Sequence, residues 1–251
     1  MNYQNKTVVV TGGAKGIGAA CAKLFFDAGV NVVLLDVASD ESNIKDRRWL
    51  YHHCDVSSET QVSEVFQKIN QHFNSIDFLV NNAGIQRYGS VTETSVDEWD
   101  LVMNVNLKSL FLCAKYAIPS MLENKKGVVI NIASVQAFVS QEKVAAYTTA
   151  KSAILGLTRS IAVDYAPHVR CVAVCPGTID TPMLRDAIAL SPDPDAVMQE
   201  CIDMHLTKRI GTAEEVAELV MFLCDDKASF ITGQAIRIDG GLGITIQGSK
   251  K

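Results

Sequence analysis

Short runs of β-branched and other apolar residues alternate along this chain with longer amphipathic stretches, and this alternation restricts the fold more than any other feature. The runs that predict strands are residues 7–10, 31–35, 50–53, 78–80, 128–132, 169–174 and 235–238. The stretches that predict helices are residues 17–28, 59–73, 97–122, 144–165 and 213–224. Strands that alternate with helices are typical of a parallel sheet covered on both faces, and nearly continuous apolar strands fit such burial. The sequence therefore predicts an α/β fold, a doubly wound Rossmann-like parallel sheet of about seven strands.

The whole chain, residues 1–251, is predicted to form a single domain. Its length suits one large α/β domain or two small ones, and no Pro-, Gly- or Ser-rich linker divides it. Residues 182–209 interrupt the alternation, with Ser191-Pro192-Asp193-Pro194 in their middle. Because this segment follows a strand, we expect it to lie over the carboxyl edge of the sheet as a small lid.

Charge and cysteine content restrict the partners. Lys and Arg number 23 against 28 Asp and Glu, a net charge of −5 that disfavours nucleic-acid binding. The apolar run near the N-terminus is too short for a signal-peptide core or a membrane span, so we expect a cytoplasmic protein with no membrane partner. The seven cysteines form no C-x-x-C pair and are read as reduced thiols, with no metal site. Cys171 and Cys175 would suit a metal only on a helix, and their run predicts a strand.

A glycine-rich turn, Thr11-Gly12-Gly13-Ala14-Lys15-Gly16-Ile17-Gly18, joins the first predicted strand to the first predicted helix. Glycine allows a tight turn and close approach to a pyrophosphate, and the helix N-terminus offers unpaired N–H groups and partial positive charge. The alternative is an ordinary tight turn, but the position between strand and helix favours a dinucleotide site. The candidate cofactor residues here are Gly12, Lys15, Gly16, Ile17 and Gly18.

Asp36 ends the second predicted strand, where an acid can accept hydrogen bonds from the adenosine ribose. Its charge would repel a 2′-phosphate, so NAD is favoured over NADP as the cofactor. Lys15 argues in the other direction, because a cation could pair with that phosphate. Asp55 is a candidate to contact the adenine, together with the following Val56, although Asp55 equally suits the start of a helix.

The remaining motifs follow in a fixed order along the chain. They are Asn81-Asn82-Ala83-Gly84, Asn106, Ser134, Tyr147-x3-Lys151, and Pro176-Gly177 followed by Thr181. Together with the glycine-rich turn, this set resembles the short-chain dehydrogenase/reductase family over nearly the whole chain. The resemblance implies a nicotinamide-dependent enzyme that acts on CH–OH groups.

Oxidation of an alcohol requires a base to take the hydroxyl proton, but a free tyrosine has a pKa of about 10. Lys151 lies one helical turn after Tyr147, on the same helix face, where its charge favours the phenolate. The resemblance implies that Lys151 also holds the nicotinamide ribose, that Ser134 bonds the reacting oxygen, and that Asn106 supports a proton-relay water. Asn104 is the rival for the relay position.

The same resemblance assigns further cofactor contacts and an assembly. Asn82, Ala83 and Gly84 would border the cofactor. Pro176, Gly177, Ile179 and Thr181 would adjoin the nicotinamide carboxamide. Helices that correspond to residues 97–122 and 144–165 pair between subunits in this family, which implies a two-fold symmetric homo-oligomer, a tetramer.

Polar side chains near the predicted nicotinamide site favour a sugar or polyol over an apolar substrate. The candidate substrate residues are Gln86, Ser134, Gln136, Gln141 and Tyr147. Glu142, Asp180, Arg185 and His205 are further side chains that we expect to reach the nicotinamide. These polar residues could instead face solvent. The segments 134–137, 170–176 and 178–183 are similar to those of aldose 1-dehydrogenases within the family. We therefore expect oxidation of an aldose at C1 to a lactone; the alternatives are a carbonyl or 3-oxoacyl reductase and a non-catalytic nucleotide sensor.

Overall fold

A seven-stranded sheet forms the centre of the molecule, in a computed structural model that describes residues 3–73 and 75–244. The strand order is β3-β2-β1-β4-β5-β6-β9, and every neighbouring pair is parallel. The strands are β1 (Thr7–Thr11), β2 (Asn31–Asp36), β3 (Trp49–His53), β4 (Phe78–Asn81), β5 (Gly127–Ile132), β6 (Val169–Pro176) and β9 (Ala235–Ile238). The predicted doubly wound sheet is confirmed. The strand order reverses between β1 and β4, and ligands of such folds bind outside the carboxyl ends at this reversal.

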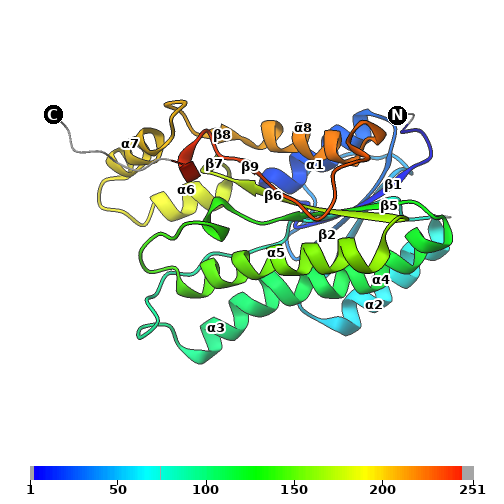
Figure 1. The fold of residues 1–251 in the computed structure, drawn as a ribbon, viewed down its shortest axis with the longest axis horizontal. Helices are drawn as coiled ribbons and strands as arrows, with labels where there is room; N and C mark the ends of the chain where they lie inside the picture. Colours follow the sequence, from blue (N-terminus) through cyan, green and yellow to red (C-terminus); the bar gives the residue numbers. More distant parts are fainter. Residues whose placement is uncertain (1–2, 74, 245–251) are drawn as a thin grey trace.

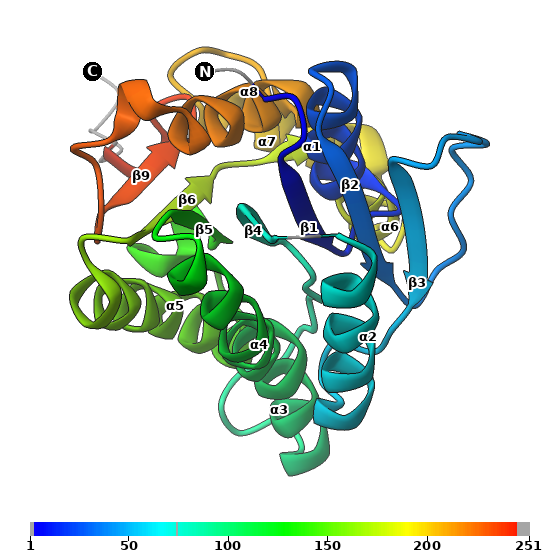
Figure 2. The same ribbon diagram turned by 90° about the vertical axis from the view of Figure 1, so that its right-hand side faces the viewer.

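Helices cover both faces of the sheet (Figures 1 and 2). One face is covered by α1 (Gly16–Asp27) and α8 (Ala213–Cys224). The other is covered by α2 (Glu59–His72), α4 (Ser109–Glu123) and α5 (Ala145–Tyr165). The short 3-10 helices are η2 (Val135–Ala137), η3 (Asp226–Ala228) and η4 (Leu242–Ile244).

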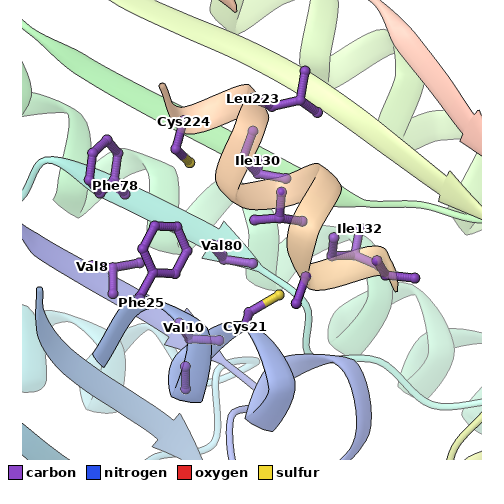
Figure 3. Close-up of a cluster of buried hydrophobic side chains, with 14 of the residues drawn as sticks. Val8, Val10, Cys21, Phe25, Phe78, Val80, Ile130, Ile132, Leu223 and Cys224 are labelled. Carbon is purple, nitrogen blue, oxygen red and sulfur yellow. The ribbon is translucent and has the colours of Figure 1, made fainter. Parts of the chain in front are cut away.

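The two cores follow from the alternation of side chains along each strand. Val8 and Val10 face α1 and α8, where they pack with Phe25 and Leu223 (Figure 3). Val9 between them belongs to the core on the opposite face. Because successive side chains of a strand point to opposite faces, a strand covered on both faces must be mainly apolar. This is why the strands were recognisable as nearly continuous apolar runs.

The stretch predicted as one helix over residues 97–122 differs from that expectation. It consists of α3 (Val96–Met103), a π-helical turn η1 (Asn104–Lys108), and α4. The N–H of Ser109 donates to the carbonyl of Asn104, five residues back. The apolar pattern alone did not distinguish this turn from an uninterrupted α-helix. Turns of this kind are frequent at functional sites.

The same stretch, Val96–Glu123, is long and apolar enough by hydropathy to cross a membrane. Half of its apolar window is buried inside the protein, where α4 packs against the sheet and against α2. Core helices of globular domains have this composition too, so hydropathy alone does not make it a membrane span.

Beyond the carboxyl ends of the strands, residues 182–209 form the predicted interruption (Figure 1). It contains α6 (Pro182–Ile188) and α7 (Pro194–Met204). A two-stranded parallel ribbon, β7 (Ile179–Asp180) with β8 (Gly211–Thr212), encloses it at both ends.

Candidate active site

The glycine-rich turn leaves β1 in a conformation that only small residues allow. Gly12 and Gly16 have φ of +61° and +55°, in the left-handed region. A Cβ on Gly18 would lie 2.1 Å from the carbonyl oxygen of Gly12, so the first turn of α1 packs directly on the loop. Lys15, at the N-cap of α1, gives no side-chain cap, so the first N–H groups of the helix are not satisfied by a cap. The turn therefore has the geometry of a pyrophosphate cradle.

The loop after β4 is fixed against this turn by hydrogen bonds. The Thr11 hydroxyl accepts from the backbone N–H groups of Asn82 and Ala83, both at 3.0 Å. The Asn82 side-chain amide donates to the carbonyls of Thr11 at 3.1 Å and Gly12 at 2.9 Å. These contacts hold Asn82, Ala83 and Gly84 beside the glycine-rich turn. Sequence reasoning missed the role of Thr11, whose position at the end of β1 was its only signal.

Asp36 joins the end of β2 to the glycine-rich turn. Its carboxylate accepts from the N–H of Ala14 and of Ala38, both at 2.9 Å. These two bonds fix the orientation of the carboxylate and leave further lone pairs for ribose hydroxyls. Lys15 is exposed next to it.

Asp55 and Val56 are less available to a cofactor than their positions suggested. The Asp55 carboxylate accepts from the N–H and the hydroxyl of Ser57, at 2.9 and 2.7 Å, in a turn that leads into α2. The Val56 side chain is buried in the core on the α2 face. The helix-start interpretation of Asp55 therefore describes its observed contacts, and only the backbone of Val56 could face a nucleotide.

Tyr147 and Lys151 lie in the first turns of α5, next to the end of β5. The Lys151 ammonium nitrogen is 5.6 Å from the centre of the Tyr147 ring, and it donates to the Ile132 carbonyl at 2.9 Å. Lys151 is only 4% exposed. Ser134 follows β5, and its hydroxyl accepts from the N–H of Gln136 at 3.1 Å. The three side chains thus meet at the carboxyl edge of the sheet.

Burial dominates the titration of this pair. It raises the pKa of Tyr147 to about 12, a shift that hydrogen bonding with Ser134 partly opposes and the nearby Tyr88 increases. Burial also lowers the pKa of Lys151 to about 8. The tyrosine is therefore protonated at rest, and it needs nearby positive charge to act as a base.

Asn106 is fully buried in η1, and its side chain is engaged by one backbone residue. Its amide oxygen accepts from the N–H of Ile85 and its amide nitrogen donates to the carbonyl of Ile85, both at 2.8 Å. The prediction that Asn106 supports a proton-relay water stays a prediction. The Asn106 side chain itself clamps the loop after Gly84, because the backbone of Ile85 satisfies both ends of the amide. The rival Asn104 lies on an outer groove between α4 and α5 instead.

Gly84 lies close to both the Asn106 side chain and the Lys151 ammonium group. A Cβ on Gly84 would lie 3.4 Å from the Asn106 amide oxygen and 3.6 Å from the Lys151 ammonium nitrogen. Three separate elements thus converge on this glycine. Ile85 was not found from the sequence, because it acts through backbone groups that every residue type shares.

The segment after β6 closes the other side of the site. The N–H of Gly177 donates to the carbonyl of Ile238, and Ile179 pairs with Gly211. A Cβ on Gly16 would lie 3.2 Å from the Thr181 methyl group, so Thr181 lies against the glycine-rich turn. The segment after β6 and the glycine-rich turn after β1 therefore lie side by side at the carboxyl edge of the sheet.

The candidate substrate residues divide into two groups. Gln136 and Gln141 come together at 3.5 Å, and the Thr148 hydroxyl donates to Gln136 at 3.3 Å, so these amides gather at the front of α5. Gln86 is half-buried on the loop after β4.

Asp180, Arg185 and His205 do not join those amides. Asp180 and Arg185 form an exposed ion pair at 2.9 Å. The expectation that the His205 side chain reaches the substrate is wrong, because it is buried against backbone groups.

Tyr88 is a residue that sequence reasoning missed. It is half-exposed, it raises the pKa of Tyr147, and burial together with the nearby Cys201 of α7 raises its own pKa. Tyr88 is therefore near both Tyr147 and Cys201. In the sequence, Tyr88 could have been found only as an aromatic residue two positions after the candidate substrate residue Gln86.

Comparison with known proteins agrees with this geometry. The family described as enoyl-(acyl carrier protein) reductase matches residues 12–243. The chain is 36% identical over 240 residues to dehydrogenase/reductase SDR family member 6 of Aquarana catesbeiana, covering 94% of this chain and 96% of that protein. It is 34% identical over 250 residues to the 3-oxoacyl-acyl-carrier-protein reductase FabG of Thermotoga maritima, covering 96% and 99%. The ligand-free structure of Thermoplasma acidophilum aldohexose dehydrogenase is similar with a TM-score of 0.94 at 40% identity, covering 99% and 98%.

The doubly wound sheet, the glycine-rich turn and the buried Tyr147/Lys151 pair define an oxidoreductase that uses a nicotinamide dinucleotide. Within that class, the chain belongs to the short-chain dehydrogenase/reductase family.

Proposed function

We propose that this enzyme oxidises the C1 hydroxyl of an aldose to a lactone, with NAD as cofactor. The observation that carries the proposal is the buried Lys151 ammonium group beneath the Tyr147 ring, with Ser134 beside it. The cradle fits a dinucleotide, because Gly12 and Gly16 adopt a positive φ in the turn and Gly18 lets the first turn of α1 pack directly on the loop, which brings the helix N-terminus close to it. When bound there, NAD supplies the hydride acceptor.

The chain's own residues handle the proton. Ser134 orients the substrate hydroxyl toward Tyr147, and the Tyr147 oxygen takes the proton as the carbonyl forms. Lys151 makes that transfer easier, because its charge stabilises the phenolate in a site with little water. Its hydrogen bond to the carbonyl of Ile132 holds the ammonium group in place. Asn106 supports the site indirectly, through Ile85.

A sugar is the favoured substrate because the entrance carries hydrogen-bonding amides. Gln136 and Gln141 can bind hydroxyl groups, and the half-exposed Tyr88 offers a ring face for a pyranose. The similarity to an aldohexose dehydrogenase at 40% identity supports the same choice. The test is a screen of aldoses with NAD and with NADP, in which the absorbance of the reduced cofactor measures turnover. Turnover of aldoses to lactones supports the proposal, and no turnover of any aldose contradicts it.

A second candidate is the reduction of a carbonyl or 3-oxoacyl substrate. Exposed apolar side chains on α6 and around α7 favour it, since an acyl chain could lie on Met183, Leu190 and Leu206. The similarity to a 3-oxoacyl-acyl-carrier-protein reductase points the same way. Oxidation of the reduced cofactor by a 3-oxoacyl thioester, faster than any aldose turnover, would favour this activity. A purely nucleotide-sensing role is disfavoured, because the chain retains the buried Tyr147/Lys151 pair.

Asp36 should make the enzyme prefer NAD. Asp36→Ala is expected to weaken NAD and admit NADP, lowering the NAD/NADP ratio of kcat/KM by about tenfold to a hundredfold, the value of a charged hydrogen bond. Asp36→Asn is the matched control, because it removes the charge but can still accept from Ala38. Lys15→Ala should leave the preference for NAD unchanged. A wild-type enzyme with equal or higher kcat/KM for NADP would show that Lys15 governs the choice.

Residues 182–209 are proposed to act as a lid. No residue of α7 is buried, and α6 buries only Ile188, so these two helices can move at low free-energy cost while the buried His205 that follows α7 stays in place. We expect NAD with a sugar substrate to slow amide hydrogen exchange in α6 and α7. If the amide exchange rates in α6 and α7 do not change when NAD and the sugar are added, the segment does not act as a lid.

The outer face of α4 and α5 is proposed as a subunit interface. A groove there is lined by Met103, Asn104, Leu107, Lys108, Phe111, Ala153 and Leu157. Phe111 is half-exposed on it, an apolar surface that a second copy could cover. We expect a two-fold symmetric tetramer, for which light scattering should give the mass of four chains, and we expect Phe111→Glu to lower that mass. A wild-type monomer at micromolar concentration would refute it.

A further inference from the structure

We propose that His205 is a positioning residue for the nicotinamide end of the cofactor site. The inference rests on the proposed function, and it concerns a residue outside the catalytic pair. His205 follows α7 and is only 2% exposed, so its imidazole is enclosed by protein. It contacts the segment Thr178–Thr181, which we name the nicotinamide segment.

Two hydrogen bonds determine the tautomer of this imidazole. Its Nε2 lies 3.2 Å from the backbone nitrogen of Thr178, which can only donate. Its Nδ1 lies 2.7 Å from the carbonyl oxygen of Cys201, which can only accept. Nδ1 must therefore carry the proton and Nε2 must accept, so the ring is neutral. The imidazole links the last turn of α7 to the start of the nicotinamide segment.

The imidazole occupies a slot between two glycines. A Cβ on Gly177 would lie 2.9 Å from the His205 Nε2, and a Cβ on Gly240 would lie 3.2 Å from its Cδ2. Both distances are shorter than ordinary van der Waals contact, so the close fit of the ring requires glycine on each side. Because the ring is held this tightly, it fixes the position of the Thr178 N–H from which its Nε2 accepts.

Thr178 transmits that position toward the cofactor. Its N–H is held by His205, and its carbonyl accepts from the N–H of Gly211 at 2.9 Å. Both backbone groups of this residue are thus fixed. The chain continues directly to Ile179 and Thr181, and Thr181 lies against Gly16 of the glycine-rich turn. Loss of the Nε2 acceptor would free the N–H of Thr178 and loosen the segment proposed to hold the carboxamide.

Two amide substitutions separate the two hydrogen bonds. The Asn side chain ends near the position of Nδ1, so His205→Asn can keep the bond to Cys201 but loses the acceptor for Thr178. The Gln side chain reaches the position of Nε2, so His205→Gln can keep that acceptor. Dissociation constants would be measured by calorimetry for NAD and for ADP-ribose, which lacks the nicotinamide.

We expect His205→Asn to weaken NAD about fivefold to tenfold, the value of one neutral hydrogen bond. ADP-ribose affinity should stay within about twofold, and His205→Gln should bind both ligands as the wild type does. The ADP-ribose affinity and a thermal melt show whether the variant is still folded. If His205 had a merely structural role, the substitution would weaken NAD and ADP-ribose equally.

Other results would overturn the inference. NAD affinity unchanged in His205→Asn, or an equal loss for NAD and ADP-ribose, would remove the positioning role. A wild-type protein that binds no nicotinamide dinucleotide would overturn the proposed function instead. Nitrogen-15 NMR of the wild-type histidines tests the geometry without any substitution: a proton on Nδ1 of His205 supports it, and one on Nε2 contradicts it.

Discussion

Tyr147→Phe should abolish turnover while leaving cofactor binding intact. The ring remains in its buried place on α5, but the oxygen that takes the substrate proton is gone. Loss of a positioned acid or base costs about a hundredfold to ten-thousandfold in rate, and we expect kcat to fall by at least about a thousandfold. The dissociation constant for NAD should change by no more than about twofold, since the phenol oxygen contributes little to nucleotide affinity.

Steady-state kinetics with the best aldose, together with an NAD titration, measures both quantities. Ser134→Ala is the matched control, because it removes the neighbouring hydroxyl and keeps the tyrosine. It should lower kcat less than Tyr147→Phe does. Activity of Tyr147→Phe within about tenfold of the wild type, a barrier change of about 1.4 kcal/mol, would show that Tyr147 is not the base.

Lys151→Ala is expected to lose both activity and cofactor affinity. The ammonium group stabilises the phenolate of Tyr147 and is proposed to bind the nicotinamide ribose, so one substitution removes two functions. We expect kcat to fall by at least about a hundredfold, and NAD affinity to fall by about tenfold to a hundredfold, as for a lost charged hydrogen bond.

Lys151→Met is the control for packing. It fills most of the volume of the buried side chain, so it separates loss of charge from formation of a cavity. Both variants leave the carbonyl of Ile132 without its donor, and thermal melts will show how much stability that costs. A Lys151 variant that binds NAD as tightly as the wild type would remove the ribose-binding role and leave only the effect on Tyr147.

The charge of Lys151 also gives a direction for pH dependence. Because burial lowers the pKa of Lys151 to about 8, the charged form decreases as the pH rises through that value. Tyr147, whose pKa burial raises, gains its basic form in the same direction. Above the pKa of Lys151 the loss of its charge offsets the gain of tyrosinate, so kcat/KM for alcohol oxidation should rise with pH and then level off near pH 8. A pH profile of kcat/KM measures this, and a continued rise above pH 8 would contradict it.

The sequence by itself determined the fold class and the family. Strands buried on both faces must be mainly apolar, so β1, β5 and β6 stand out as nearly continuous apolar runs. The glycine-rich turn was readable because a positive φ and close approach to backbone require glycine at Gly12 and Gly16. The spacing of Tyr147 and Lys151 follows from the helical repeat alone.

Only the tertiary structure decided the contacts that position the site. Asn106 clamps Ile85 through backbone groups, and His205 binds backbone groups of Thr178 and Cys201. Backbone groups are the same in every residue type, so their partners leave no trace in a sequence pattern. The π-helical turn η1 was likewise not found, because it is defined by a backbone hydrogen bond, from the N–H of Ser109 to the carbonyl of Asn104. His205, which from its position in the lid could have faced the substrate, is turned inward because a slot between Gly177 and Gly240 admits its ring.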